Sequence, residues 1–468
     1  MTSIVRLLTI VALAVAAAGC ASLAPPVPVA DTAIPAVWPT TPVAQPAGVP
    51  AQPADLGWRD FFADPALNAL IARALQNNRD LRAAVLTVER ARALYRIQRA
   101  DQFPTVGGSF GMLKSGGANV AAARDEYSVT LGLTDYELDL FGRVRDLSRA
   151  ALERYFAQAE TTRAAQLTLV SEVAYAWFTL AADRELEKVA RATLETQEAT
   201  FRITEQRHER GAVSGLEVAQ VRTTVESARS DLARYAGQVA RDVNALNLLV
   251  GETIEPAALP QDFGTSMLQM ATLPPGLPSE VLLQRPDVLA AERRLLAANA
   301  DIGAARAAFF PSIRLTGALG TSSDALSALF GSGTSLWSFA PQVRVPIFEG
   351  GRLQANLDAA RAEQDIALAQ YERAVQAAFR EAADALALAR TLADQLAAQQ
   401  ALVDAAARAN TLSNARFMAG RDSYLVALDA QRTLFASQQS LVATRLAEQA
   451  NRVALYKALG GGVREVTE

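Results

Sequence analysis

Two stretches of this 468-residue chain contain neither glycine nor proline, and each is 68 residues long. The first lies between Gly142 and Gly211, and the second lies between Gly351 and Gly420. Glycine and proline disfavour a helix interior most strongly, whereas alanine, which is abundant here, favours it. Each stretch is therefore predicted to be helical, and one unbroken helix of this length would span about 100 Å. Two stacked helices are the alternative, with candidate breaks at 181–183 and 394–395.

The two halves of the chain repeat each other with an offset of about 207–209 residues. In both halves an arginine, Arg207 or Arg416, stands four residues before the glycine that ends the long stretch. Each half reads as a helix, strands, the long helical stretch, a sharp turn and a returning helix. The second returning helix carries Leu428, Phe435 and Val442 at intervals of seven, which is typical of a coiled-coil seam. An ordinary helical bundle would carry the same seam.

Four runs of alternating apolar and polar residues predict β-strands, two in each half. In one run Tyr127, Val129 and Leu131 alternate with serine, threonine and glycine. Each run approaches the roughly 9–11 residues of a tilted membrane strand. Four strands cannot close a barrel, so several chains would pool them; a small soluble sheet packed on helices is the alternative. The expected strands cover about residues 104–113, 126–141, 311–320 and 335–348.

The composition argues against several classes of protein. The chain has 45 Lys+Arg and 49 Asp+Glu, and a net charge of −4 does not indicate a nucleic-acid surface. One cysteine and one histidine exclude a disulfide within the chain and nearly exclude a Cys/His metal site or a Ser-His-Asp site. No phosphate loop or nucleophile motif is present. We therefore expect neither an enzyme nor a metal or cofactor.

The single cysteine follows an apparent export signal. Residues 1–19 contain a basic Arg6 and an apolar run, which are typical of a signal peptide. The run ends Ala-Ala-Gly-Cys at Cys20, and this resembles the lipobox of bacterial lipoproteins, in which the cysteine is acylated. An ordinary secretory peptide is the alternative. A proline-rich segment follows and predicts an extended tether over residues 20–54.

A long stretch of the second half carries a resemblance to a known family. The sequence from Gly276 through Arg285-Pro286-Asp287 to Ala297-Ala298-Asn299-Ala300 and Ile302–Ile313 resembles the lipidated outer-membrane efflux proteins, the NodT-type branch of the TolC-like outer-membrane factor family. The resemblance extends from Cys20 to about Gly460. It implies a mainly α protein with a membrane β-barrel portion, in which three chains form a twelve-stranded barrel on a tube of long coiled-coil helices in the periplasm.

The resemblance also implies partners and a location. The homotrimer would dock to a periplasmic adaptor and serve an inner-membrane pump of the resistance–nodulation–division class, with no nucleic acid involved. It would lie in the outer membrane, held by palmitate-type acylation of Cys20, which is the only group added to the chain. It would be the exit duct of a tripartite efflux system for passive transport of small molecules.

Site residues follow from the same resemblance. Leu425 and Asp429 lie one helical turn apart and match the positions that constrict the closed tube in relatives. Three copies of Asp429 would favour cation binding; an interhelical ion pair is the alternative. His208, near the first turn, is expected to face solvent. The tips expected to touch the adaptor are Gly211, Val213, Ser214, Gly420, Asp422 and Ser423.

Two other functions remain open at this stage. A type I exit duct for proteins would use the same fold, and a non-conducting structural lipoprotein would use the same anchor. The sequence does not indicate which substrate is exported or which pump is served. The expected organisation is a signal peptide at 1–19, anchor and tether at 20–54, a first repeat at 55–260, an equatorial linker at 261–278, a second repeat at 279–460 and a tail at 461–468.

Overall fold

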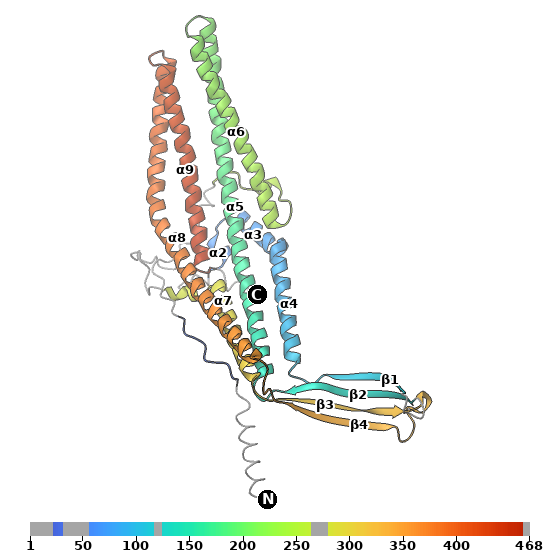
Figure 1. Cartoon of the computed structure of the whole chain (residues 1–468). Helices are drawn as coiled ribbons and strands as arrows, with labels where there is room; N and C mark the ends of the chain where they lie inside the picture. Colours follow the sequence, from blue (N-terminus) through green and yellow to red (C-terminus); the bar gives the residue numbers. More distant parts are fainter. Residues whose placement is uncertain (1–21, 31–55, 117–123, 264–278, 462–468) are drawn as a thin grey trace. The chain divides into compact units, whose positions relative to one another are not determined.

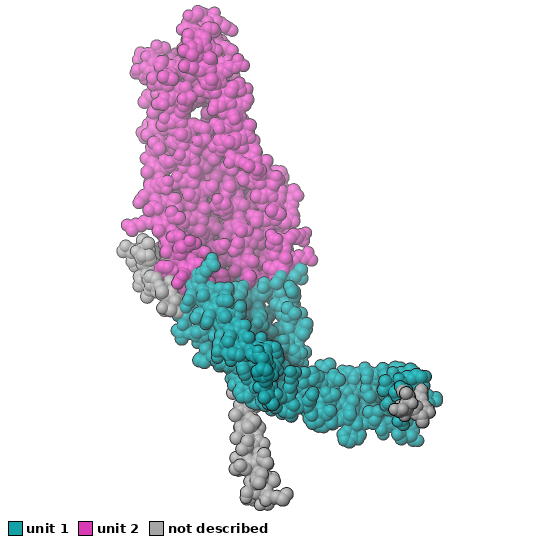
Figure 2. Space-filling model, viewed as in Figure 1, with its two compact units in different colours: residues 1–31, 86–160, 289–373 teal, residues 32–85, 161–288, 374–468 magenta. Residues whose placement is uncertain are grey.

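The computed structural model describes residues 22–30, 56–116, 124–263 and 279–461. The predicted signal peptide and Cys20 lie outside the described residues, as do most of the tether and linker and nearly all of the tail. The chain divides into two compact units, and each unit draws on both halves of the sequence (Figure 2). Unit 1 contains residues 1–31, 86–160 and 289–373, and unit 2 contains 32–85, 161–288 and 374–468.

Each glycine- and proline-free stretch forms one uninterrupted helix of 67 residues (Figure 1). These helices are α5 (Arg143–Glu209) and α8 (Arg352–Met418). The candidate breaks into stacked helices are therefore wrong, because nothing in either stretch interrupts the backbone hydrogen bonds. The returning helices are α6 (Gly215–Val250) and α9 (Tyr424–Ala458).

The helix predicted at the start of the first repeat is interrupted at Asn78. The Asn78 side chain caps the following helix by accepting a hydrogen bond from the Leu81 amide at 2.8 Å, and its amide group donates to the Leu249 carbonyl at 2.8 Å. An asparagine that bonds to the backbone in this way favours a helix start over a helix interior. The helices of these regions are α2 (Trp58–Phe61), α3 (Pro65–Asn77), α4 (Arg79–Ala100) and α7 (Pro286–Ala307), with 3-10 turns at Pro256–Ala258, Ser279–Gln284 and Leu326–Ala328.

The four predicted strands form one antiparallel sheet in unit 1, in the order β1-β2-β3-β4. Its second hairpin is shifted from the expected limits, since β3 continues to Ser323 and β4 ends at Arg344. Pro346 follows two residues later and cannot donate a ladder hydrogen bond. The strands are β1 (Val106–Ser115), β2 (Arg124–Leu138), β3 (Ser312–Ser323) and β4 (Ser335–Arg344).

The sheet has one apolar face and one polar face. Leu131 of β2 lies opposite Leu319 of β3, which lies opposite Trp337 of β4, and all three are more than half exposed. A bulge at Asp135, where φ is 55°, keeps the later residues of β2 in phase with this row. The Arg314 guanidinium binds the Asp135 carboxylate at 2.6 Å on the opposite face. Residues that alternate with the apolar row are mainly glycine, serine, threonine and charged residues.

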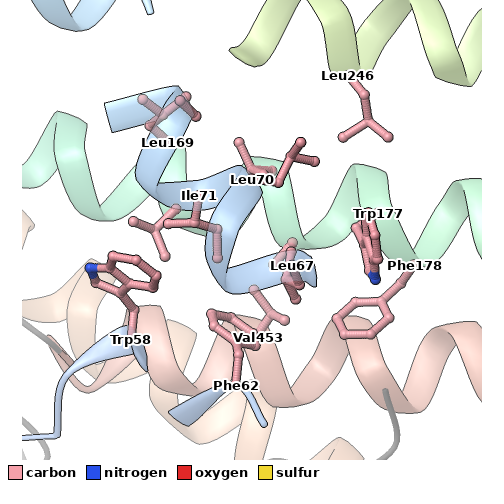
Figure 3. Close-up of a cluster of buried hydrophobic side chains, with 14 of the residues drawn as sticks. Trp58, Phe62, Leu67, Leu70, Ile71, Leu169, Trp177, Phe178, Leu246 and Val453 are labelled. Atoms are coloured by element: carbon pink, nitrogen blue, oxygen red, sulfur yellow. The ribbon is translucent and has the colours of Figure 1, made fainter. Parts of the chain in front are cut away.

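The largest buried cluster lies in unit 2, where α3 packs against α5, α6 and α9. Figure 3 shows Leu67, Trp177 and Val453 converging from three of these helices. Trp177 and Leu67 are almost fully buried, and burying side chains of this size stabilises the fold by roughly 2–3 kcal/mol each. Among the described helices, none combines the length and the apolar character needed to cross a membrane.

Candidate functional site at the two helix reversals

Both long helices end in the same hydrogen-bonded turn. The amide of Gly211 donates to the His208 carbonyl at 2.8 Å, and the amide of Ala212 donates to the Arg207 carbonyl at 2.8 Å. The equivalent pair of bonds, both 2.9 Å, ends the second long helix at Gly420. Both glycines have a positive φ, 73° and 70°, which side chains with a Cβ rarely adopt. This Schellman arrangement explains why glycine ends both stretches and how the chain reverses within a few residues.

The returning helices start differently after these turns. The hydroxyl of Ser214 accepts a hydrogen bond from the Glu217 amide at 3.3 Å and so caps α6. Ser423 stands at the start of α9 and makes no such side-chain cap. Instead, the carboxylate beside it, Asp422, accepts two hydrogen bonds from Arg416, at 2.5 and 2.9 Å. These hydrogen bonds lower the pKa of Asp422 below its usual value.

The arginine of the first reversal contacts the second reversal. The Arg207 guanidinium donates to the Met418 carbonyl at 3.2 Å and lies 5.4 Å from the centre of the Phe417 ring. Arg416 is its counterpart in the second half and bonds within its own turn. The two reversals are thus joined by a hydrogen bond and a cation–π contact, each worth on the order of 1 kcal/mol at an exposed site.

A small buried cluster lies beside this contact in unit 2. Phe417 packs against Tyr424, with ring centres 5.5 Å apart, and Val221 of α6 belongs to the same buried cluster. Ala427 and Leu428 complete the cluster from α9. The side chains come from both reversals, so the second hairpin is attached to the first through apolar packing as well as through Arg207.

Tyr424 also carries a buried polar network to the first hairpin. Its hydroxyl lies 3.2 Å from the Thr224 hydroxyl on α6 and donates to the Gln197 amide oxygen on α5 at 3.4 Å. Thr224 donates to the same oxygen at 2.8 Å. Burial raises the pKa of the Tyr424 phenol above its usual value. The phenol therefore stays protonated and continues to act as a donor.

The two predicted aperture residues lie on one exposed face of α9. Leu425 is 64% exposed, and Asp429, one turn later, is also exposed. Their neighbours Ala427 and Leu428 point into the cluster instead. Within the described chain the Asp429 carboxylate forms no ion pair, so the alternative of a salt bridge within one protomer has no partner there. The role of Leu425 and Asp429 in a constriction stays a prediction.

The remaining predicted residues take the following positions. Gly211, Ser214, Gly420 and Ser423 are exposed, whereas Val213 and Asp422 are partly covered. His208 is exposed as expected, and its Nδ1 atom lies 2.9 Å from the Val213 carbonyl oxygen, a contact that the sequence did not suggest. Cys20 is outside the described residues. In the part of the chain that the structure describes, no cluster of His, Cys, Asp and Glu could hold a metal ion.

No local pattern in the sequence indicates the residues that join the two hairpins. Gln197 and Thr224 are polar residues inside long helices, where exposure is the usual state. Only the position of Phe417, a large aromatic residue three residues before Gly420, offered a signal of packing at the turn.

Known proteins with similar sequences and structures provide the context for this site. The family model described as outer membrane efflux protein matches residues 70–252 and 277–461. The chain is 45% identical over 456 residues to the toluene efflux pump outer membrane protein TtgC of Pseudomonas putida, covering 96% of this chain and 94% of that protein. It is 43% identical over 415 residues to the outer membrane protein OprJ of Pseudomonas aeruginosa, covering 87% and 86% of the two chains.

Two solved structures match the fold over nearly all of the chain. The open state of the Neisseria gonorrhoeae MtrE outer membrane channel has a TM-score of 0.86 and 38% identity, and the match covers 96% of this chain and 100% of MtrE. CusC, described for its transmembrane channel formation, has a TM-score of 0.85 and 40% identity, with 94% and 100% covered. These likenesses confirm the predicted fold class.

Proposed function

This chain belongs to the outer membrane efflux protein family, and from that membership we propose which of its parts form the channel wall, the closure and the anchor. The protein is the outer-membrane component of an efflux pump, a passive exit duct and not an enzyme. It works with an adaptor and an inner-membrane pump, and its channel is a trimer. The resemblance of residues 276–313 to the NodT-type branch supports a pump of the resistance–nodulation–division class. The toluene efflux relative supports small organic molecules as cargo.

The observation that carries the channel assignment is the four-stranded sheet of unit 1. Its edge strands, β1 and β4, have one neighbour each among the described strands, and one of its faces is apolar and exposed. Unpaired strand edges cost several kcal/mol for each backbone group placed in lipid. In our proposal β4 of one protomer pairs with β1 of the next, so that three chains supply twelve strands. The row containing Leu131, Leu319 and Trp337 then faces lipid, and the polar face lines the lumen.

The closure is proposed to lie at the helix reversals. The exposed pair Leu425 and Asp429 would meet its two symmetry copies and narrow the tube by an apolar ring next to a ring of carboxylates. The turns around Gly211 and Gly420 would present Val213, Ser214, Asp422 and Ser423 to the adaptor. The adaptor would bind the open state of the tips more tightly than the closed state, and its binding would therefore shift the equilibrium toward the open state.

The anchor is proposed to be a lipid on Cys20. The sequence Ala-Ala-Gly-Cys after an apolar run supports acylation, and two or more acyl chains would hold the protein stably at the membrane surface. Mass spectrometry of the mature protein tests this proposal directly. A mature N-terminus at Cys20 with the mass of added acyl chains is expected, and an unmodified cysteine or a different N-terminus would contradict it.

Conductance in planar bilayers tests the channel itself. The purified trimer is expected to insert and to give discrete single-channel steps that are small when the tips are closed. A chain that binds the bilayer without conducting, even when Leu425 and Asp429 are replaced by alanine, would contradict the duct and favour a structural lipoprotein. A duct dedicated to protein secretion would conduct as well, but it would not restore toluene tolerance when it replaces the channel of a toluene-exporting pump.

A further inference from the structure

The short segment that follows the predicted lipidation site lies against the helices of unit 1. Residues 22–30 form neither helix nor strand, and three contacts fix their first four residues. The Ser22 hydroxyl donates to the Asp146 carboxylate of α5 at 2.6 Å. The Leu23 carbonyl accepts from the Arg306 guanidinium at 3.0 Å, and the Pro25 carbonyl accepts from the Asn299 amide group at 3.0 Å. We call residues 22–30 the N-terminal strap.

The residues of α7 that contact the strap share one helix face. Asn299, Gly303 and Arg306 follow one another at spacings of four and three, which places them in a single row. All three belong to the sequence stretch that most resembles the family. The Asn299 side chain is buried, and its oxygen accepts a hydrogen bond from Gln364 of α8 at 2.5 Å. That bond orients the Asn299 amide so that its NH₂ group points at the Pro25 carbonyl.

Gly303 allows the strap to approach the helix closely. A Cβ atom on this glycine would lie 2.8 Å from the Ala24 nitrogen and would collide with the Asp146 carboxylate. Such contacts are too short, so any larger residue would displace the strap or the carboxylate. Gly303 lies inside α7 with ordinary helical backbone angles, so its backbone conformation does not require glycine. The close approach of Ala24 and Asp146 is therefore the reason for a glycine here.

Asp146 connects the strap to the start of α5. This carboxylate is only 2% exposed, and burial raises its pKa while the hydrogen bond from Ser22 opposes that rise. A buried carboxylate without partners is strongly unfavourable. The Ser22 hydroxyl supplies one of the hydrogen bonds that the carboxylate needs, so the strap belongs to the packing of this helix end.

We propose that the row Asn299, Gly303 and Arg306, together with Asp146, is a binding site for the chain's own segment Ser22–Pro25. The site recognises an extended segment with free carbonyl groups, and it holds the segment antiparallel to α7. A segment with prolines fits this chemistry because proline favours an extended backbone, and Pro25, Pro26 and Pro28 carry no N–H group that would need a partner. Docking needs no lipid, since every contact is made by the protein.

The site also determines where the chain's beginning meets the membrane, and this consequence rests on the proposed acylation of Cys20. Cys20 is two residues from Ser22, so the covalent chain keeps it within about 7 Å of Ser22. Ser22 is fixed at the first turn of α5, which follows β2, and the strap begins near the end of α7, which precedes β3. The acyl chains are thereby tied to the junction between the helices and the sheet of unit 1.

The mobility of a spin label on the strap tests the proposal in the full-length, membrane-inserted trimer. Val27, just beyond the docked residues, is 41% exposed, so Val27→Cys can carry a nitroxide without disturbing the contacts. A docked strap is expected to give a slow component in the spectrum. Combining Asn299→Ala with Arg306→Ala, or introducing Gly303→Ala alone, should shorten the rotational correlation time by roughly threefold or more. Equal line shapes in the parent and these variants would overturn the proposal.

Two controls separate loss of docking from other failures. Gly237→Ala is the matched control, because Gly237 is also inside a helix and a Cβ there meets nothing within 4 Å; its spectrum should equal that of the parent. Ser22→Ala alters only the strap and should also increase mobility, so the test stands even where a helix variant fails to fold. Labelling of the chain without Val27→Cys measures acylation of Cys20 separately. This chain takes up no label when Cys20 is acylated and one label per chain when Cys20 is free.

Discussion

The two helical hairpins of this protein, α5–α6 and α8–α9, share a turn and differ in what surrounds it. At the offset of 209 positions that relates Gly211 to Gly420, Gly215 corresponds to Tyr424. Gly215 is exposed, whereas Tyr424 is buried and bonds to Thr224 and Gln197 of the other hairpin. The turn geometry is common to both halves because helix reversal demands it. The packing beside the turn differs because one hairpin has to attach to the other.

A second difference lies at the other end of the returning helices. The first hairpin holds two carboxylates together, Asp183 on α5 and Asp242 on α6. At the same offset the second hairpin has Leu392 and Asn451, both buried, and the Asn451 amide donates to the Ala385 carbonyl at 2.9 Å. At this position the second hairpin therefore has a neutral, hydrogen-bonded side chain. The first hairpin has a carboxyl group there that is hard to ionise.

The largest effect is expected when the proposed aperture is removed. Replacing Leu425 and Asp429 together by alanine should raise single-channel conductance severalfold, because the narrowest part of the closed tube loses both its apolar ring and its carboxylate ring. The corresponding residues of the first hairpin, Leu216 and Gln220, are also exposed. Their double alanine variant is the matched control and should conduct like the parent. A larger increase in conductance for the control variant would mean that the first hairpin forms the constriction.

The carboxylate pair predicts a pH dependence of stability. Burial, followed by the adjacent Asp183 carboxyl group, raises the pKa of Asp242 to about 7. When the pKa of a carboxyl group is higher in the folded state than in the unfolded state, the folded protein is most stable below the unfolded-state pKa. This contribution to stability is lost as the pH rises through the folded-state pKa. The free energy of unfolding should therefore fall between about pH 4 and pH 7. Arg241 acts on Asp242 in the opposite direction, and Glu172 and Lys457 line the same surface hollow.

Asp242→Asn copies the residue found in the second hairpin and should remove this dependence. At pH 8 it should stabilise the trimer by on the order of 2 kcal/mol per chain, since each pKa unit corresponds to about 1.4 kcal/mol and the pair remains partly solvated. Thermal unfolding at pH 5 and pH 8 measures the effect. Asp231→Asn, which removes a surface ion pair with Arg234, is the control. A Tm for Asp242→Asn that follows the parent at both pH values would contradict the shared burial of the pair.

Tyr424→Phe tests the attachment of the second hairpin to the first. The ring stays in the cluster, but Thr224 and Gln197, which remain hydrogen-bonded to each other, lose the phenol hydroxyl as a shared partner. The expected loss is about 1 kcal/mol of stability, with faster hydrogen exchange confined to the two reversals. Tyr175→Phe, at a side chain that is 51% exposed, is the matched control and should change neither quantity. Unchanged exchange in Tyr424→Phe would mean that the apolar cluster and the Arg207 contacts hold the hairpins together without the phenol hydroxyl.

The features that could be predicted from the sequence are those with a local physical cause. The lengths of α5 and α8 follow from the absence of glycine and proline, and the turns follow from glycines at positive φ. The break at Asn78 was missed because its cap and its bond to Leu249 depend on a distant helix end. The network around Tyr424 and the strap site on Asn299 were missed for the same reason. Each depends on which segments meet in the fold, and no local pattern in the sequence encodes that.

The smallest expected difference lies in the caps of the two returning helices. Ser214→Ala removes the hydroxyl that accepts from the Glu217 amide and should cost about 0.5–1 kcal/mol. Ser423→Ala should cost close to nothing, because the Ser423 hydroxyl caps no amide of α9. Hydrogen exchange at the first turn of each helix separates the two variants better than global unfolding does. Equal effects of both substitutions would show that the Ser423 hydroxyl stabilises the start of α9 as the Ser214 hydroxyl stabilises the start of α6, and that the two reversals do not differ in their caps.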